Sequence, residues 1–149
     1  MKKILYCDLD GVLTDFSSAL PFFSADILKT FDGRLDEIPG IFSKMSPVVG
    51  AIEAFEILSE RFDTYILSTA PWNNPSAWSD KLEWVKTNLG NRAYKRLILT
   101  HHKNLNKGDF LVDDREKNGA GEFAGELILF RSERFPDWVT VTKYLLTKL

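Results

Sequence analysis

The sequence predicts an α/β fold in which a parallel sheet of about five strands carries helices on both faces. Short apolar runs typical of buried strands recur along the chain, and segments with apolar residues at helical spacing separate them. Strands that alternate with helices pair in parallel through right-handed crossovers, so the helices lie on the faces of the sheet. A chain of 149 residues is long enough for one sizeable core. We therefore expect a single domain over residues 1–149.

The expected strands are short apolar runs, and the first of them ends in a polar turn at residues 8–11. They are residues 3–7, 62–68, 97–100, 110–112 and 127–130. Helices are expected at residues 48–60, 79–89 and 138–149. Gly90 follows the second helix and is the residue type that most often ends one. Residues 70–75 combine prolines with asparagines, so we expect a loop there.

The segment from residue 16 to residue 47 interrupts this alternation of strands and helices. It is long, rich in aromatic residues and punctuated by Pro21, Gly33, Pro39 and Gly40. Because long insertions of this kind often cover active sites, we expect a small lid after the first strand, at about residues 17–46.

Composition and charge exclude several classes of protein. The chain is 44% hydrophobic and 27% charged with a formal net charge of −2, as in ordinary globular proteins. Its lysines and arginines are scattered rather than aligned, which argues against a nucleic-acid polymer as partner. The apolar run at the N-terminus is too short for a signal peptide or a membrane span, so we expect a cytoplasmic protein with no membrane partner. Cys7, the only cysteine, lies in an apolar run and is interpreted as an inert strand residue.

An acidic turn follows the first expected strand. Asp8 and Asp10 stand two residues apart, so the pleat of the strand directs both carboxylates to the same side, and Gly11 permits the turn that exposes them. This arrangement suits a nucleophile and a proton-transfer group that act on one substrate. Aspartates are also common in turns and helix caps, so the pair alone does not establish catalysis.

Three further polar features follow later strands. Thr69 comes after the second strand, Lys103 after the third, and the pair Asp113 and Asp114 after the fourth. Because ligands of parallel sheets collect at the carboxyl ends of the strands, we expect these side chains to meet the acidic turn. Crowded carboxylates repel one another and need a hard cation such as Mg²⁺, which binds oxygen ligands and leaves room for a phosphate. Lys103 and the Thr69 hydroxyl can then hold the phosphate oxygens.

These motifs resemble those of a known superfamily. Residues 8–14 (DLDGVLT), Thr69, Lys103 and the pair Asp113–Asp114 match, in order, the four motifs of the haloacid dehalogenase-like superfamily. The resemblance implies a Rossmann-like core and an aspartyl-phosphate intermediate on Asp8. It also implies Mg²⁺ held by Asp8, by the backbone carbonyl of Asp10 and by the late acidic pair, with Asp114 as the direct ligand and Asp113 as its outer partner.

The roles implied by this resemblance define a phosphatase. Asp8 attacks phosphorus, and Asp10 protonates the leaving oxygen and then deprotonates the water that hydrolyses the aspartyl phosphate. A related dehalogenase needs no acid at the second position, and related transport ATPases carry Thr there. The carboxylate of Asp10 therefore favours phosphate hydrolysis over both alternatives.

Within the superfamily the core is similar to the 5′(3′)-deoxyribonucleotidases. The similarity lies in residues 8–16, 67–71, 83–85, 99–103 and 113–114. It implies that Phe16 packs on the substrate and that lid aromatics complete an apolar wall, which disfavours a ribose 2′-hydroxyl left without a partner. Ala70 replaces a family Ser, and Asn73 stands where a Lys often assists phosphate binding.

The expected protein is thus an Mg²⁺-dependent hydrolase of (deoxy)ribonucleoside monophosphates. Two alternatives remain open: a phosphatase of another small metabolite such as a sugar phosphate, and a non-catalytic phosphate-binding module. His101 and His102 are adjacent and project in different directions, so a metal site built on them is disfavoured.

Overall fold

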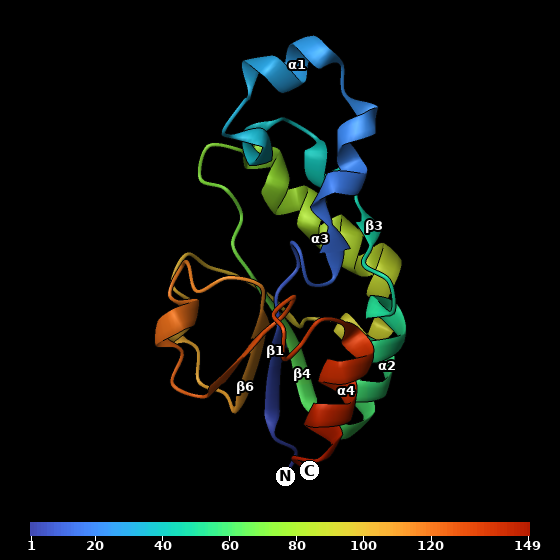
Figure 1. Ribbon diagram of the computed structural model, residues 1–149, viewed down its shortest axis with the longest axis vertical. Coiled ribbons are helices and arrows are strands. Elements are labelled where there is room, and N and C mark those ends of the chain that lie inside the picture. Colours follow the sequence, from blue (N-terminus) through green and yellow to red (C-terminus); the bar gives the residue numbers. More distant parts are fainter.

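A parallel sheet lies at the centre of the computed structural model, which describes residues 1–149 (Figure 1). Its strands are β1 (Ile4–Cys7), β4 (Asp63–Ser68), β5 (Leu97–Leu99), β6 (Phe110–Asp113) and β7 (Glu126–Leu129). They are ordered β5-β4-β1-β6-β7, and every neighbouring pair is parallel. All five expected strands are therefore confirmed. Cys7 pairs with Ile66 on one side and Val112 on the other, so the chain leaves the sheet at its centre when it reaches Asp8.

The expected helices are also present, with shifted ends. They are α2 (Ala51–Arg61), α3 (Pro75–Leu89) and α4 (Trp138–Leu146). Helix α3 begins at Pro75, earlier than expected, because a proline in the first turn of a helix has no N–H that needs an intrahelical partner. Gly90 follows it with a φ of 61°, in the left-handed region that glycine adopts readily at a helix end.

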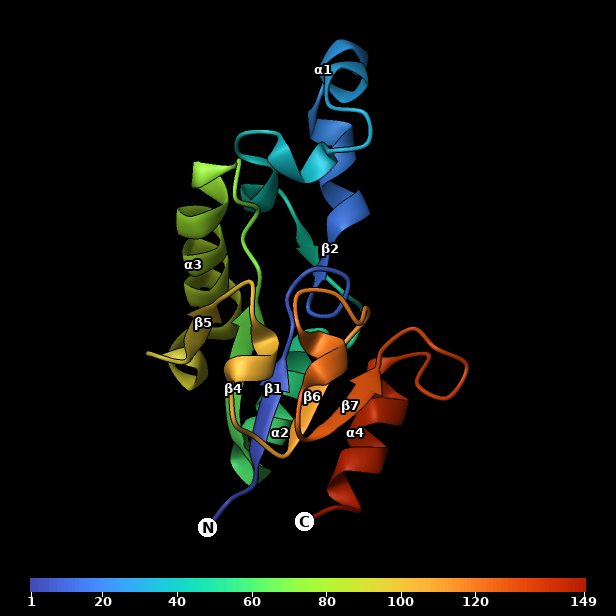
Figure 2. The same ribbon diagram turned by 90° about the vertical axis from the view of Figure 1, so that its left-hand side faces the viewer.

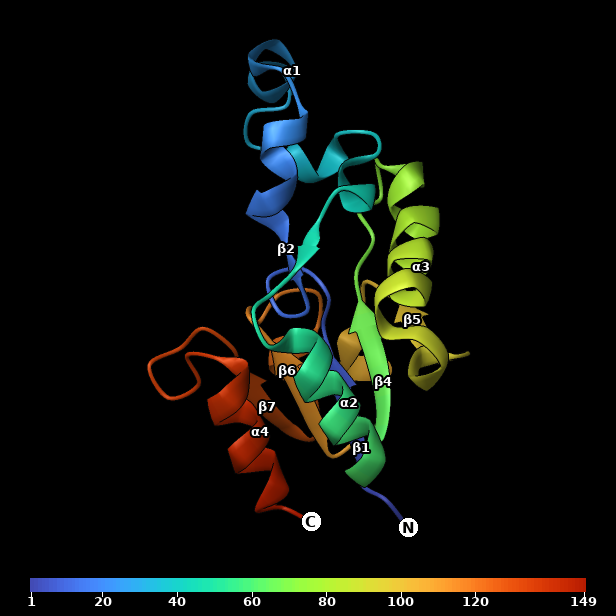
Figure 3. The same cartoon turned by 90° about the vertical axis from the view of Figure 1, so that its right-hand side faces the viewer.

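Both faces of the sheet are covered, but by different structures. Alternate residues of a strand point to opposite faces, so Leu5 and Cys7 pack in a cluster with α2 and α4, seen in front of the sheet in Figure 3. Tyr6 points the other way and packs with Ala120 and Phe123. That second face carries two single-turn 3₁₀-helices, η5 (Lys103–Leu105) and η6 (Ala120–Glu122), seen in front in Figure 2.

The segment expected as a lid corresponds to an insertion beyond the carboxyl end of the sheet (Figures 1 and 3). A short antiparallel ribbon of β2 (Thr14–Asp15) and β3 (Ser46–Pro47) joins it to the core. We call residues 16–45, between these strands, the insertion. It contains η1 (Phe16–Phe22), α1 (Ala25–Thr30), η2 (Leu35–Glu37) and η3 (Ile41–Ser43).

Helix α3 runs beside both the sheet and the insertion and connects them (Figure 3). At its start, the amide of Asn74 donates hydrogen bonds to the carbonyl oxygens of Asp36 at 2.9 Å and Ile38 at 3.1 Å. Further along, the indole N–H of Trp84 donates to the carbonyl oxygen of Met45 at 2.9 Å. Hydrogen bonds thus hold the insertion to α3 at two places. None of the helices combines the length and apolar character needed to cross a membrane.

Candidate active site

The carboxyl ends of β1 and β6 bring the predicted aspartates together. Asp8 continues β1 and donates its N–H to the carbonyl oxygen of Val112 in β6 at 2.9 Å. Its side chain is buried, whereas that of Asp10 reaches the surface of a cavity. Gly11 allows the chain to turn between them, because its φ of 77° is rarely adopted by residues with a side chain.

Lys103 lies between two of the carboxylates. Its Nζ is 2.6 Å from Oδ2 of Asp113 and 3.1 Å from Oδ1 of Asp8, and all three side chains are buried. The backbone N–H of Lys103 donates to the carbonyl oxygen of Asn118 at 2.8 Å, which fixes the start of η5. Burial by itself would lower the pKa of Lys103, but the carboxylates of Asp8 and Asp113 outweigh burial and raise it.

Asp8, Asp113 and Asp114 form a cluster whose ligand oxygens lie within 4.8 Å of one another. Oδ1 of Asp114 is buried and has no hydrogen-bond partner. Asp113 is already engaged at both oxygens, because Oδ2 contacts Lys103 and Oδ1 accepts the N–H of Arg115 at 3.1 Å. An all-carboxylate cluster with one unpartnered buried oxygen fits a hard divalent cation. Asp8 and Asp114 are the residues best able to bind it directly.

The pKa values of the three carboxyls reflect this crowding. Burial raises the pKa of Asp8 to about 7; the positive charge of Lys103 opposes that shift, and Asp113 adds to it. Burial also raises the pKa of Asp113, again against the effect of Lys103. The pKa of Asp114 is raised by burial first and by the charge of Asp8 second. A bound cation would favour the ionised form of each carboxylate.

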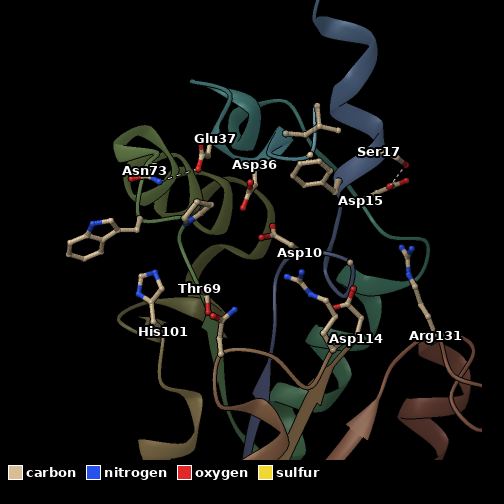
Figure 4. A pocket seen from close by; sticks show the side chains of 18 residues that line it. Asp10, Asp15, Ser17, Asp36, Glu37, Thr69, Asn73, His101, Asp114 and Arg131 are labelled. Carbon is tan, nitrogen blue, oxygen red and sulfur yellow. Dashed lines mark hydrogen bonds and ion pairs between the residues drawn. The ribbon is translucent and has the colours of Figure 1, made fainter. Parts of the chain in front are cut away.

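Above these residues lies a cavity of about 810 Å³ between the sheet and the insertion (Figure 4). Four of the predicted residues line it: Asp10, Phe16, Thr69 and Asp114. The other three are the buried ones, Asp8, Lys103 and Asp113. The predicted residues therefore lie close together: four of them line the cavity, and three charged residues are buried beneath it. The Thr69 hydroxyl donates to the carbonyl oxygen of Thr100 at 2.7 Å, an interaction that it would have to exchange for one with phosphate.

The insertion contributes few aromatic rings to the cavity. The resemblance implied an apolar wall of lid aromatics, but apart from Phe16 none of the insertion's phenylalanines lines the cavity: Phe22, Phe23, Phe31 and Phe42. Phe42 is buried in an apolar cluster that the insertion forms with Ala70 and Ala77, and Phe23 and Phe31 pack against this cluster. The cavity surface opposite Asp10 includes Asp36 and Glu37 instead (Figure 4).

The rim of the cavity contains residues to which the sequence assigned no role in binding. Trp72 lines the cavity and is 79% exposed. The ring centroid of His101, also on the rim, is 6.0 Å from that of Trp72 and 6.3 Å from that of Trp78. Asn73 donates to Oε1 of Glu37 at 3.2 Å, so this loop is linked to the insertion. Arg115 is largely exposed, with Nε 4.0 Å from Oδ1 of Asp114.

Lys81 is a residue of the site that the sequence reading missed. It lies in the middle of α3, and its ammonium group is 2.7 Å from Oδ2 of Asp10. Within an amphipathic helix a lysine is normally read as a surface residue. Its spacing carried a signal, because Ala77, Trp84 and Val85, at four residues before and three and four residues after, are all buried on the same side of the helix.

This fold is the fold of the haloacid dehalogenase-like hydrolases. YfnB of Bacillus subtilis, provisionally named a HAD-hydrolase and solved bound to magnesium, superimposes with a TM-score of 0.60 at 11% identity over 91% of this chain and 90% of that chain. A hydrolase from Streptococcus pneumoniae TIGR4 gives a TM-score of 0.58 at 12% identity over 97% and 99% of the two chains.

Sequence relatives define the family more closely. The chain belongs to the family of 5′ nucleotidase, deoxy (pyrimidine), cytosolic type C proteins, whose sequence model matches residues 27–136. A protein of Vibrio phage KVP40, provisionally named 5′(3′)-deoxyribonucleotidase, is 57% identical over 97% of this chain and 85% of its own length. A protein of the same provisional name from Bordetella bronchiseptica is 44% identical over 75% and 74% of the two chains.

Proposed function

We propose that this protein is an Mg²⁺-dependent phosphomonoesterase that hydrolyses deoxyribonucleoside monophosphates, with Asp8 as the nucleophile. The observation that carries the proposal is the position of Asp8 at the centre of the sheet's carboxyl edge, paired with Lys103 at 3.1 Å beneath a cavity of nucleotide size. The family and its named relatives support the substrate class. We infer that the enzyme acts in the cytoplasm, with no nucleic-acid polymer or membrane as partner.

The nucleophile is held ready for attack by its neighbours. Lys103 contacts Oδ1 of Asp8, which leaves Oδ2 free to form a bond to phosphorus while the bond to the leaving oxygen breaks. The same ammonium group can stabilise charge on the transferring phosphoryl group, and the Thr69 hydroxyl can donate to one of its oxygens. Asp8, Asp114 and the backbone carbonyl of Asp10 would hold the cation. Mg²⁺ bound there would reduce the repulsion between the Asp8 carboxylate and the phosphate dianion.

Asp10 serves both halves of the reaction as the proton-transfer group. It gives a proton to the leaving oxygen as the aspartyl phosphate forms on Asp8, and it then takes a proton from the water that hydrolyses this intermediate. Its position on the cavity surface, two residues after the nucleophile, supports this role. The products are the nucleoside and inorganic phosphate, and both aspartates return to their starting states.

The polar surface of the insertion favours a second candidate substrate class. Asp36 and Glu37 can accept hydrogen bonds from hydroxyl groups, which suits a sugar phosphate or another polar metabolite. Phe16, the one phenylalanine that lines the cavity, instead suits packing against a nucleoside. A non-catalytic phosphate-binding module would not need the carboxylate of Asp10.

A panel of substrates tests the proposal. Relative kcat/KM values for dUMP, dTMP, UMP and several sugar phosphates should rank the deoxynucleotides first, and Phe16→Ala should remove much of the preference for dUMP over UMP. The Asp8→Asn variant, purified in the same way, measures the phosphatase activity of contaminating proteins. Equal rates for UMP and dUMP would contradict the deoxyribonucleotide assignment, and a preference for sugar phosphates would favour the second candidate. No turnover of any ester would favour the binding module.

A further inference from the structure

Lys81 is the one buried lysine of the structure besides Lys103, and it contacts the proposed proton-transfer group. It is 1% exposed, and its Nζ is 2.7 Å from Oδ2 of Asp10 and donates to the hydroxyl of Ser68 at 2.9 Å. The same ammonium group lies 4.4 Å from the centroid of the Phe42 ring, which belongs to the insertion. Lys81 therefore joins α3, β4, the insertion and the acidic turn at one point.

Apart from Asp10, the surroundings of Lys81 do not account for a charge at this position. The neighbours of Lys81 on its side of α3 are apolar, and Phe42 adds an aromatic ring. Desolvating a lysine costs several kcal/mol, and replacing a buried ion pair by well-packed apolar groups is often neutral or stabilising. A buried lysine whose carboxylate partner reaches the cavity thus indicates a function for the charge.

The contacts of Asp10 show what this function can be. Lys81 occupies Oδ2, whereas Oδ1 accepts only a longer hydrogen bond, from the Thr14 hydroxyl at 3.2 Å. The carboxylate is therefore anchored at one oxygen, and the other oxygen remains for proton transfer with a group in the cavity. Without this anchor the Asp10 carboxylate would keep only the longer hydrogen bond from Thr14, so other side-chain rotamers of Asp10 would become accessible.

We propose that Lys81 is a positioning residue that orients the Asp10 carboxylate for proton transfer, and that Phe42 extends this control to the insertion. The proposal rests on the proposed function, because it assumes that Asp10 moves the proton. Lys81 does not line the cavity, so it acts through Asp10 rather than on the substrate. Misplacing a catalytic group by about 1 Å can cost about 10²-fold in rate.

The test compares kinetic and thermal effects of Lys81→Met, which keeps most of the shape of the side chain and removes its charge. We expect kcat for dUMP to fall about 10- to 100-fold with little change in KM. In single-turnover experiments the loss should be smaller for p-nitrophenyl phosphate than for an alkyl phosphate, because a good leaving group needs less protonation. Lys86→Met is the matched control, since Lys86 lies on the exposed side of the same helix and its side chain is 63% exposed.

A double-mutant cycle with Asp10→Asn separates positioning from a general structural role. If Lys81 acts through Asp10, adding Lys81→Met to the Asp10→Asn enzyme should lower kcat very little further. Each substitution should still change the melting temperature. Losses in kcat that multiply would overturn the proposal. If Lys81→Met does not fold, Lys81→Gln and Phe42→Leu replace it in the test. Both variants should lower kcat on the same steps without raising KM. Wild-type kcat in both variants would overturn the proposal.

The two proposals fail in distinguishable ways. If Asp10→Asn turns over as fast as the unmodified enzyme, the assignment of Asp10 is wrong and the inference about Lys81 falls with it. If Asp10→Asn is slow and folded Lys81→Met is fast, only the inference about Lys81 is wrong, and the proposed function stands.

Discussion

At the scale of single residues, Asp113 and Asp114 are neighbours in sequence with different surroundings. Both oxygens of Asp113 are bonded within the protein, whereas Oδ1 of Asp114 is buried without a partner. We therefore expect Asp114→Asn to weaken the apparent affinity for Mg²⁺ more than Asp113→Asn does, although changes to outer partners of a metal still cost about 10- to 100-fold. Activity measured against Mg²⁺ concentration for the two variants provides the comparison. The reverse order would mean that the roles of the two residues are exchanged.

The residues of the site were predictable where local sequence reports their surroundings. Asp8, Asp10, Thr69 and Lys103 follow short apolar strands, and parallel pairing alone brings such positions together. Lys81 was not predictable in this way, because it lies in the middle of α3 rather than after a strand. The positions of the lid aromatics also depended on tertiary packing, since a phenylalanine can bury its ring against the insertion or against a ligand equally well.

At the scale of elements, the turn after β1 depends on Gly11. Its φ is 77°, and a Cβ at this position would lie 2.2 Å from Oδ2 of Asp114. Gly11→Ala should therefore lower the free energy of unfolding by about 1–2 kcal/mol through backbone strain and should also displace the Asp114 carboxylate. We expect the apparent affinity for Mg²⁺ to fall by more than the loss of stability explains. Thermal denaturation measures the stability, and activity against Mg²⁺ concentration measures the affinity.

Gly40→Ala is the matched control for this turn. Gly40 has a φ of 82°, but a Cβ there would meet nothing within 4 Å. A comparable loss of stability with unchanged Mg²⁺ dependence is expected. If both variants change the Mg²⁺ response equally, the contact between Gly11 and Asp114 does not matter for the metal.

The junction between α3 and the insertion depends on Asn74. Its buried amide donates to the carbonyl oxygens of Asp36 and Ile38, so Asn74→Ala leaves both carbonyl groups without this partner. We expect the free energy of unfolding to fall by about 1–3 kcal/mol and the KM for a nucleotide to rise, because Asp36 lines the cavity. Chemical denaturation and steady-state kinetics measure the two effects. Ser79→Ala, at an exposed position of the same helix, should change neither, and an equal effect there would show that the junction is not specific.

The elements themselves followed closely from the sequence, and their ends did so less well. Strand identity depends on short apolar runs, which local sequence reports directly, even for the partly exposed edge strands β5 and β7. The start of α3 at Pro75 was missed because the prolines and asparagines of residues 70–75 favour a loop, and proline is also a good first residue of a helix. The insertion was predicted as a lid, but its short helices were not, because prolines and glycines interrupt its apolar pattern.

At the scale of the whole molecule, the fold places the proposed catalytic aspartates at the carboxyl edge of the sheet and covers them with the insertion. The central position of β1 places Asp8 between neighbouring strands, where backbone pairing on both sides holds it. The insertion connects to the sheet through the two-residue strands β2 and β3 and through α3. Substitutions of insertion residues that line the cavity, such as Asp36, should therefore alter substrate choice, whereas substitutions of Asp8 or Asp10 should alter the chemistry for all substrates.

The measurement that tests the account most directly is chemical trapping of the phosphorylated enzyme. Rapid acid quenching during turnover of dUMP, followed by proteolysis and mass spectrometry, should find phosphate on the peptide that contains Asp8. Hydroxylamine should remove it, as for an acyl phosphate, and Asp8→Asn should carry none. Full turnover without any phosphoryl group on Asp8 at the earliest quench times, or undiminished turnover by Asp8→Asn, would contradict the role of Asp8 as the nucleophile.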